Sequence, residues 1–219
     1  MNDEFIQNVK SLGEEGEKWL TNIPTLIKLY EEKWQIECFD PFQLSYNYVL
    51  PAKTRSGEQV VLKISFPNNH EFRSEINALK LYEGNGAINV IREDVENKVV
   101  LLERAVPGTR VGDVQPDGKQ ITLVSETIKK IHKPVQPQDD LGFPTLVDWA
   151  KAFERYRGNF DIKTGPIPKR MFEEAAEIFS QYTVDDGSCI LLHGDLHNDN
   201  ILLSERGWLA IDPKGVIGN

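Results

Sequence analysis

Apolar residues recur every three to four positions along the start of the chain, which is the period of an amphipathic helix. Two stretches keep this period, residues 5–12 and residues 19–34, and residues 13–16, with a glycine at each end, separate them. Pro24 fits near the first turn of the second helix, where its missing N–H removes no hydrogen bond. The N-terminus is therefore expected to form two helices, each with one apolar face.

The pattern then changes to the β-branched and aromatic content that is typical of strands. Five strands are expected at 36–42, 46–52, 59–65, 87–92 and 98–103, with one helix at 72–82. Gly84 and Gly86 end that helix. Pro107-Gly108 then breaks the chain, so we place a lobe boundary here, with an N-terminal lobe at 1–104 and a C-terminal lobe at 105–219.

The second half of the chain is mainly helical in pattern. Helices are expected at 120–132, 146–157 and 168–182, a Pro-rich loop at 133–144, a short buried strand at 189–193, and a hairpin at 201–203 and 208–211. Strands with one helix first, and mostly helices afterwards, predict an α+β fold with two segregated lobes.

Composition narrows the class of protein. The chain has 219 residues, 40% hydrophobic and 27% charged, as is ordinary for a globular protein that buries a sizeable core. Its net charge of -9 argues against binding to nucleic acid or an anionic membrane and suits a cationic small substrate. No apolar run can span a bilayer and the N-terminus is unlike a signal peptide, so the cytoplasm is expected. Cys38 and Cys189 are expected to be reduced core residues rather than a disulfide.

One segment brings together the residue types that phosphoryl transfer requires. Asp195 follows an apolar run in LHGDLHNDN, Asn200 comes five residues later, and Asp212 follows a short hydrophobic hairpin. In a kinase-like loop this spacing provides an aspartate that orients the hydroxyl nucleophile, and an asparagine and an aspartate that bind magnesium. Mg²⁺ takes oxygen ligands from one or two side chains plus the phosphates. The segment predicts an ATP-dependent kinase, with ATP and Mg²⁺ as cofactors.

A lone lysine in an apolar strand indicates a second part of the same site. Lys63 lies in VVLKI, and a buried lysine needs a partner of opposite charge. Glu75 on the following helix suits this role better than Glu71, one turn earlier, because Glu75 precedes the apolar face more directly. In a kinase, such a lysine binds the α- and β-phosphates while the glutamate holds it. The alternative is a lysine whose stem snorkels along an edge strand.

The histidines around Asp195 leave a competing interpretation open. His193, Asp195 and His197 alternate and could cluster as ligands of a metallohydrolase. The other histidines, His70 and His132, lie in unrelated contexts, so further ligands at a recognisable spacing are missing. We therefore favour the kinase, and expect His193 to brace the loop and His197 to lie near the substrate.

The last strand of the first lobe ends at LLERA and enters a linker. Its backbone offers adenine a carbonyl at Glu103 and an amide at Ala105. Any strand that runs into a linker offers such groups, so this assignment depends on the kinase interpretation. The side chains of Glu103 and Arg104 are expected to be solvated.

With these residues, the chain resembles the aminoglycoside phosphotransferases, small-molecule relatives of the protein kinases. Within them it is most similar to the aminoglycoside 6-phosphotransferase/hydroxyurea-resistance kinase family, which includes streptomycin kinases. The resemblance covers nearly the whole chain, in segments 16–34, 75–87 (EINALKLYEGNGA), 101–108 (LLERAVPG) and 191–215 (LLHGDLHNDNILLSERGWLAIDPKG). It implies a bilobal protein-kinase-like fold, with an N-terminal β-sheet lobe and a helical C-terminal lobe.

The resemblance also implies roles for individual residues and a class of acceptor. The implied roles are orientation of the acceptor hydroxyl by Asp195, magnesium binding by Asn200 and Asp212, phosphate clamping by Lys63 with Glu75, and adenine contact by Glu103 and Ala105. The implied acceptor is a streptomycin-like aminoglycoside, and its positive charge suits an acidic chain. Acidic pairs at 139–140 and 185–186 are interpreted as solvated loops rather than as antibiotic contacts.

The chain departs from the family pattern at three places. Residues 42–47 contain no glycine, which limits how closely backbone amides approach phosphate, although the Ser45 hydroxyl can still reach. Asn198-Asp199 stands where relatives often carry Pro-Gly. The chain stops at Asn219, whereas relatives continue into helices that complete the substrate pocket, so the C-terminal lobe is expected to be truncated. Two alternatives to an aminoglycoside kinase remain: a kinase for another small alcohol or sugar, and a catalytically incomplete nucleotide-binding fragment.

Overall fold

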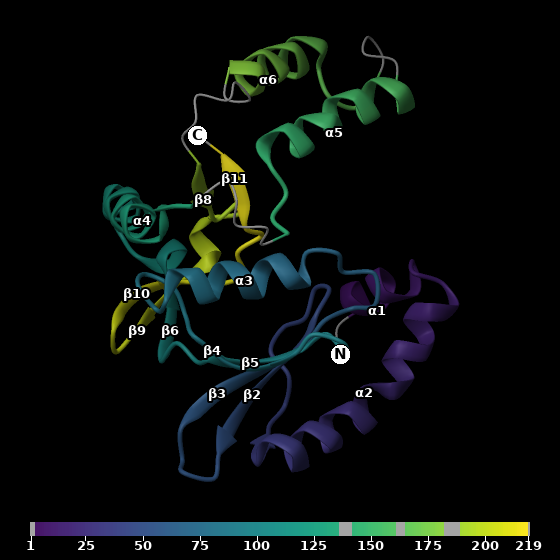
Figure 1. The fold of residues 1–219 in the computed structure, drawn as a ribbon, viewed down its shortest axis with the longest axis vertical. Helices are drawn as coiled ribbons and strands as arrows, with labels where there is room; N and C mark the ends of the chain where they lie inside the picture. Colours follow the sequence, from purple (N-terminus) through teal and green to yellow (C-terminus); the bar gives the residue numbers. More distant parts are fainter. Residues whose placement is uncertain (1–2, 136–141, 161–164, 182–188, 219) are drawn as a thin grey trace.

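The computed structural model describes residues 3–135, 142–160, 165–181 and 189–218 (Figure 1). Its largest sheet has five antiparallel strands in the order β1-β2-β3-β5-β4. These strands are β1 (Ile36–Cys38), β2 (Tyr48–Thr54), β3 (Gln59–Ile64), β4 (Val90–Asp94) and β5 (Val99–Glu103). All five lie within a few residues of their expected positions, and the first is shorter than the pattern indicates.

Helices cover both faces of this sheet, as Figure 1 shows. Helices α1 (Asp3–Lys10) and α2 (Glu14–Trp34) pack on one face, and α3 (Phe72–Tyr82) lies over the other. Side chains alternate along β3, so Leu62 is buried towards α2 and Val61 and Lys63 point to the opposite face. The alternation therefore decides that Lys63 faces α3 and the C-terminal half of the chain.

The N-terminal helices correct two expectations. Helix α2 begins at Glu14 rather than near Trp19, so Gly16 lies inside the helix and does not interrupt it. A Cβ on Gly16 would come within 2.1 Å of the carbonyl oxygen of Val9, which shows that glycine is needed where α1 and α2 touch. Pro24 is in the helix interior and not in its first turn. Pro24 has no N–H to donate, so one backbone hydrogen bond of the helix is missing. Packing of the buried face of α2 against the sheet stabilises the helix despite this loss.

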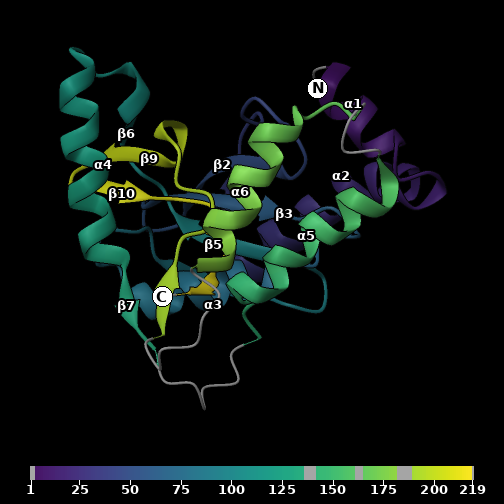
Figure 2. The same cartoon turned by 90° about the horizontal axis from the view of Figure 1, so that it is seen from above.

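The C-terminal half combines helices with two small three-stranded sheets, ordered β10-β9-β6 and β11-β8-β7. Its helices are α4 (Asp117–Ile131), α5 (Leu146–Asn159) and α6 (Lys169–Gln181), with single turns η1 (Val111–Asp113) and η2 (Asn198–Asn200). Its strands are β6 (Pro107–Arg110), β7 (Lys133–Pro134), β8 (Ile190–Leu192), β9 (Ile201–Ser204), β10 (Gly207–Ala210) and β11 (Val216–Gly218). In Figure 2, α4 lies beside the β9–β10 hairpin, and α5 and α6 lie together away from it.

Several expectations for this half are confirmed and others need correction. The hairpin near 201–211 and the strand near 189–193 are present. Cys189, like Cys38 in β1, is free as expected, but both are partly buried rather than core residues. Pro107-Gly108 does not break the chain but starts β6, which pairs with β9. The 133–144 loop begins with β7, which pairs with β8. The acidic pairs at 139–140 and 185–186 lie outside the described residues. No helix within the described ranges is long and apolar enough to cross a membrane.

A single apolar cluster joins the main sheet to the C-terminal half. Leu79 of α3 belongs to the same buried cluster as Leu102 of β5, Ile131 of α4, Leu191 of β8 and Leu209 of β10. Because α3 packs on both sides, it holds β3 and β5 at a fixed place above the loop that follows β8. This packing positions the site described below.

Candidate active site

Two hollows meet between the main sheet and the loop that follows β8. The first, a cavity of about 570 Å³ here named the polar compartment, is lined by Lys63, Glu75, Asp195, Asn200 and Asp212, among others. The second, about 400 Å³ and named the apolar compartment, is lined by apolar residues from both sides and by the 103–105 linker. Lys63 and Asp212 line both compartments, so the two form one continuous cleft.

The floor of the polar compartment is a cation held between two carboxylates. Lys63 Nζ lies 2.7 Å from Glu75 Oε1 and 3.0 Å from Asp212 Oδ1. The lysine and Glu75 are buried, whereas half of the Asp212 side chain is exposed to the cleft. The rival partner Glu71 instead pairs with Lys214 over 2.9 Å. Of the two glutamates considered from the sequence, Glu75 is therefore the one that meets Lys63.

Electrostatics keep Lys63 and Asp212 ionised, whereas burial, against the attraction of Lys63, raises the pKa of Glu75 above its ordinary value. Burial opposes the charge on Lys63, but Asp212 and Glu75 outweigh that effect and hold the pKa of Lys63 above its ordinary value. Against the effect of burial, Lys63 holds the pKa of Asp212 below its ordinary value. The single charge of Lys63 is shared between two carboxyl groups, and the ionised, half-exposed Asp212 faces the cleft. Such a group attracts a further cation into the cleft.

His193 braces the loop that carries Asp195. It is buried, its Nδ1 accepts from the N–H of Asp195 over 3.2 Å, and its Nε2 lies 2.9 Å from the carbonyl oxygen of Ile211. These contacts require a proton on Nε2 and none on Nδ1, which is the neutral form. The His193 carbonyl oxygen also accepts from the N–H of Lys214 over 2.8 Å. One residue thus connects the Asp195 loop to the segment around Asp212.

This geometry predicts a pH dependence of stability. Burial lowers the pKa of His193 to about 4, below the ordinary value of about 6.5 for an unfolded chain. As pH falls from 6.5 to 4, the unfolded state binds a proton that the folded state does not, so the free energy of unfolding falls by up to about 3 kcal/mol. Urea unfolding between pH 8 and pH 4 measures this decrease.

His193→Gln is expected to be less stable at pH 8 but to lose this part of the decrease, because no imidazole remains to be protonated. His70→Gln, at an exposed position, is the matched control and should keep the decrease seen in the unsubstituted protein. An unchanged pH dependence in His193→Gln would contradict the assignment of the decrease to His193.

The β9–β10 hairpin presents two oxygen-bearing side chains at its base. Asn200 is buried, and its Nδ2 donates to the carbonyl oxygen of Asp195 over 2.9 Å, which leaves its Oδ1 for another partner. The N–H of Ile211 donates to the carbonyl oxygen of Asn200 over 3.0 Å and closes the base. Asp212 follows with a φ of 54°, a left-handed conformation that costs a residue with a side chain roughly 1 kcal/mol or more. Strain at a residue that faces the cleft is typical of functional sites.

Asp195 and His197 lie at the exposed side of the polar compartment. No ion pair involves Asp195 within the described part of the chain, so its carboxylate is open to a ligand in the cleft. The Nδ1 atom of His197 accepts from the N–H of Asp199 at the start of η2. His197 therefore supports the loop and also lines the compartment, and its expected place near a substrate stays a prediction.

The apolar compartment has the lining that a flat heterocycle requires. Val49, Val61 and Leu102 come from the main sheet, and Leu202 and Ile211 come from the opposite side. The 103–105 linker forms one edge. In the described ranges, the N–H of the linker residue 105 donates to no acceptor. An apolar slot with an open backbone amide at its edge suits a nucleobase.

The side chain of Glu103 is mostly covered and ion-paired, whereas the sequence predicts that it is solvated. Arg206 binds its carboxylate over 2.6 and 2.8 Å, and Asn89 also donates to it. Arg206 is 103 residues and Asn89 is 14 residues from Glu103 in sequence, so no local sequence pattern predicts these contacts. The guanidinium of Arg104 lies 5.6 Å from the ring centroid of Phe42, which also lines the apolar compartment.

Ser45 and Asn47 lie where the two compartments join. The carbonyl oxygen of Ser45 accepts from Asn8 over 2.9 Å. Its hydroxyl has no hydrogen-bond partner among the described residues and is available to the cleft. Asn47 was not identified from the sequence. Its Oδ1 accepts from the Ser65 hydroxyl and from the N–H of Phe66, so that its Nδ2 donor is left for a ligand. A polar residue just before a strand is too common a pattern to have indicated this role.

The donor set fits magnesium better than a transition metal. Asn200 and Asp212 offer oxygen atoms, and the surrounding excess of carboxylates balances a divalent cation. Within the described residues, no group of three His, Cys, Asp or Glu side chains can hold a metal ion. Both ring nitrogens of His193 already have protein partners, so it cannot serve as a ligand. The metallohydrolase interpretation therefore receives no support.

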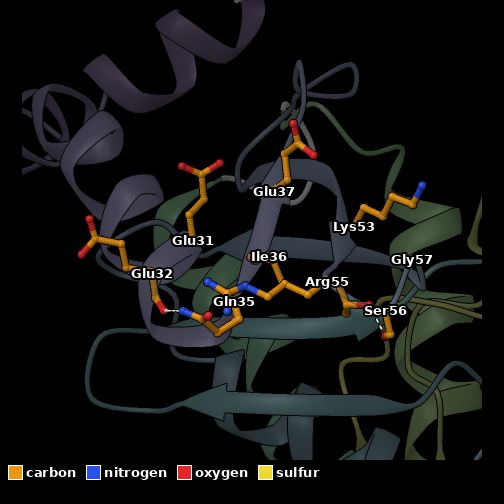
Figure 3. A pocket seen from close by; sticks show the side chains of 10 residues that line it. Glu31, Glu32, Gln35, Ile36, Glu37, Lys53, Arg55, Ser56 and Gly57 are labelled. Atoms are coloured by element: carbon orange, nitrogen blue, oxygen red, sulfur yellow. Dashed lines mark hydrogen bonds between the residues drawn. The ribbon is translucent and has the colours of Figure 1, made fainter.

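A further hollow lies away from these residues, between the end of α2 and the β1–β2 edge (Figure 3). Glu37 points outward there and Lys53 points away from it, whereas Glu31 accepts from the backbone N–H of Cys38 over 2.9 Å. None of the residues proposed from the sequence lines it. Its charged groups do not converge on one point, so we assign no chemistry to it.

The cleft, the ion pair beneath it and the sheet-plus-helix architecture define a small-molecule kinase with a protein-kinase-like fold. The chain belongs to the aminoglycoside/hydroxyurea antibiotic resistance kinase family, whose sequence profile matches residues 36–219. This match confirms the family assignment made from the sequence, and the solved structures described next confirm the fold.

The chain is also similar in sequence or in fold to individual phosphotransferases. The chain is 27% identical over 214 residues to streptomycin 6-kinase from Streptomyces glaucescens, covering 96% of this chain and 68% of that protein. The fold matches a macrolide 2'-phosphotransferase from Brachybacterium faecium, with a TM-score of 0.60, 14% identity, and coverage of 89% and 73% of the two chains. It also matches a spectinomycin phosphotransferase in complex with ADP and spectinomycin, with a TM-score of 0.57, 14% identity, and coverage of 88% and 70%.

Proposed function

We propose that this protein transfers the γ-phosphoryl group of ATP to a hydroxyl of a streptomycin-like aminoglycoside, with Mg²⁺ as cofactor. The observation that carries the proposal is the Glu75–Lys63–Asp212 ion-paired group, which faces Asp195 and Asn200 across one cleft that continues into an apolar slot. The family includes antibiotic resistance kinases, and a relative of the same fold binds ADP.

Each residue then has a defined task. The apolar compartment and the backbone of Glu103 and Ala105 receive adenine, and Lys63, held by Glu75, orients the phosphates, with Ser45 as a further phosphate contact. Asn200 and Asp212 would hold Mg²⁺, which when bound neutralises charge on the phosphates. Asp195 accepts or steers the proton of the acceptor hydroxyl. The two lobes, proposed at 1–104 and 105–219, supply opposite walls of the cleft.

Charge favours a cationic acceptor. Glu71, Glu75, Asp195 and Asp212 line the polar compartment, against only Lys63 and Lys214. An aminoglycoside brings ammonium groups that this excess of carboxylates attracts. The relative from Streptomyces glaucescens is named for streptomycin, whereas the structures of similar fold are named for a macrolide and for spectinomycin. The sequence relationship therefore makes streptomycin the first acceptor to test.

Transfer of radiolabelled phosphate from ATP to a panel of acceptors tests the proposal. We expect labelled product with streptomycin and little with uncharged sugars, and we expect chelation of Mg²⁺ to abolish it. Labelled product with only a sugar or another small alcohol would favour the alternative kinase. Binding of Mg-ATP without transfer to any acceptor would favour a nucleotide-binding protein without catalysis and contradict the proposal.

A further inference from the structure

The turn between β9 and β10 carries Arg206, whose side chain reaches the end of the main sheet. Its Nε and Nη2 donate to the two carboxylate oxygens of Glu103 over 2.8 and 2.6 Å. Its Nη1 donates to the carbonyl oxygen of Gly84 over 2.8 Å, and Nη2 lies 3.4 Å from that of Ala87. A guanidinium that holds a carboxylate through two nitrogens fixes orientation as well as distance. One side chain therefore ties the hairpin to two neighbouring segments, the end of β5 and the connection between α3 and β4.

Both ends of this tie are themselves held. The Ser204 hydroxyl accepts from the N–H of Arg206 over 3.0 Å and donates to the carbonyl oxygen of Gly207 over 2.9 Å, which fixes the turn. Glu103 Oε2 also accepts from the backbone N–H and the Nδ2 of Asn89, over 2.9 and 2.7 Å. The tie cannot be moved at one end without straining several hydrogen bonds.

The hairpin that carries Arg206 spans the distance between the two ends of the cleft. At its turn, Arg206 holds Glu103, which starts the linker beside the apolar compartment. At its base, Asn200 precedes β9 and Asp212 follows β10. The strands are paired along their whole length, from the Ser204–Gly207 pair to the Ile201–Ala210 pair, so a displacement of the turn also displaces the base.

We propose that Arg206 is a positioning residue that sets the alignment of the adenine end of the cleft with its metal-binding end. The inference rests on the proposed nucleotide-dependent function. ATP must engage both ends at once, whereas adenosine needs only the apolar compartment and Mg-tripolyphosphate needs only the polar one. Loss of Arg206 should therefore weaken the binding of ATP, which bridges both ends, far more than the binding of adenosine or of Mg-tripolyphosphate.

The test compares Arg206→Met with the unsubstituted protein in calorimetric titrations of Mg-ATP, adenosine and Mg-tripolyphosphate. We expect the Kd of Mg-ATP to rise about tenfold and the other two Kd values to stay within about twofold. The kcat should fall by up to about 100-fold, because an error of about 1 Å in positioning costs that much, while KM for the acceptor stays unchanged. Arg206→Lys keeps the positive charge but cannot hold the Glu103 carboxylate through two nitrogen atoms, so it should behave as Arg206→Met does.

The matched control is Arg170→Met, which breaks an exposed Arg–Glu pair of 2.7 Å with Glu174 on α6 and should leave all three Kd values unchanged. Equal losses for all three ligands in the Arg206 variants would indicate a general structural role and overturn the inference. Full Mg-ATP affinity in Arg206→Lys would also overturn it, since charge alone would then suffice. Should Arg206→Met not fold, Arg206→Lys carries the same comparison.

The unsubstituted protein separates this inference from the function on which it rests. If it binds none of the three ligands, the proposed function fails and the inference falls with it. If it binds Mg-ATP and the Arg206 variants bind Mg-ATP equally well, only the inference is wrong.

Discussion

Asp195→Ala is expected to abolish phosphoryl transfer while Mg-ATP still binds. The Asp195 carboxylate is exposed in the polar compartment, where an acceptor hydroxyl would lie between it and the phosphates. Its backbone is held independently of its side chain, by His193 at the N–H and by Asn200 at the carbonyl oxygen. The variant should therefore keep the loop in place. We expect kcat to fall by about 10³-fold or more, which is the contribution of a well-placed general base together with its orienting effect.

Single-turnover transfer from radiolabelled ATP measures this loss, and calorimetry with Mg-ATP measures binding. Asp199→Ala is the matched control, because Asp199 lies on the same loop but pairs with Arg110 over 3.3 Å outside the polar compartment. It should change kcat by no more than about twofold, as is typical of an exposed ion pair. Turnover retained by Asp195→Ala would remove Asp195 from the mechanism.

The sequence predicts the ends of a helix or strand well where neighbouring residues determine them, and poorly where contacts with a distant segment do. Helix α3 is expected at 72–82 and observed as Phe72–Tyr82, because its end depends on nearby residues: Glu83 and Gly84 adopt positive φ there. Helix α2 begins five residues earlier than its apolar pattern indicates. The close approach of Gly16 to Val9 explains the difference, and a contact between two helices leaves no periodic signal. Packing between elements thus decides what local propensity leaves open.

In the candidate site, too, a locally determined contact can be predicted from the sequence, and contacts between distant segments cannot. A lysine alone in an apolar strand must find a carboxylate, so the pairing of Lys63 with Glu75 can be expected from the sequence. Nothing local indicates that Asp212, 149 residues away, joins the pair, or that Arg206 holds Glu103. Those contacts exist because α3 and the β9–β10 hairpin pack against the same sheet. The roles assigned to these residues remain predictions, which substitution tests.

Asp212→Ala is expected to weaken Mg-dependent nucleotide binding by at least about 100-fold, since loss of a metal ligand costs more than loss of a group that only orients one. Mg-free ATP binding should respond differently. Asp212 lies 3.0 Å from Lys63 Nζ and neutralises part of its charge, so its removal leaves Lys63 more attractive to phosphate. Mg-free ATP affinity should therefore stay constant or rise. Titrations of ATP with Mg²⁺ and with a chelator measure the two affinities.

The loss of affinity with Mg²⁺, without a loss in its absence, separates a metal ligand from a structural residue. A variant that is merely misfolded loses affinity with and without Mg²⁺, and that result would contradict the assignment of Asp212. Asp212→Asn keeps an oxygen atom at the same place but loses the charge, so its Mg-dependent affinity should lie between those of Asp212→Ala and the unsubstituted protein. Glu174→Ala on α6 removes an exposed carboxylate far from the cleft and should change neither affinity. Since Lys63 contacts both carboxylates, the Asp212 variants also test whether Glu75 alone can hold the lysine in place.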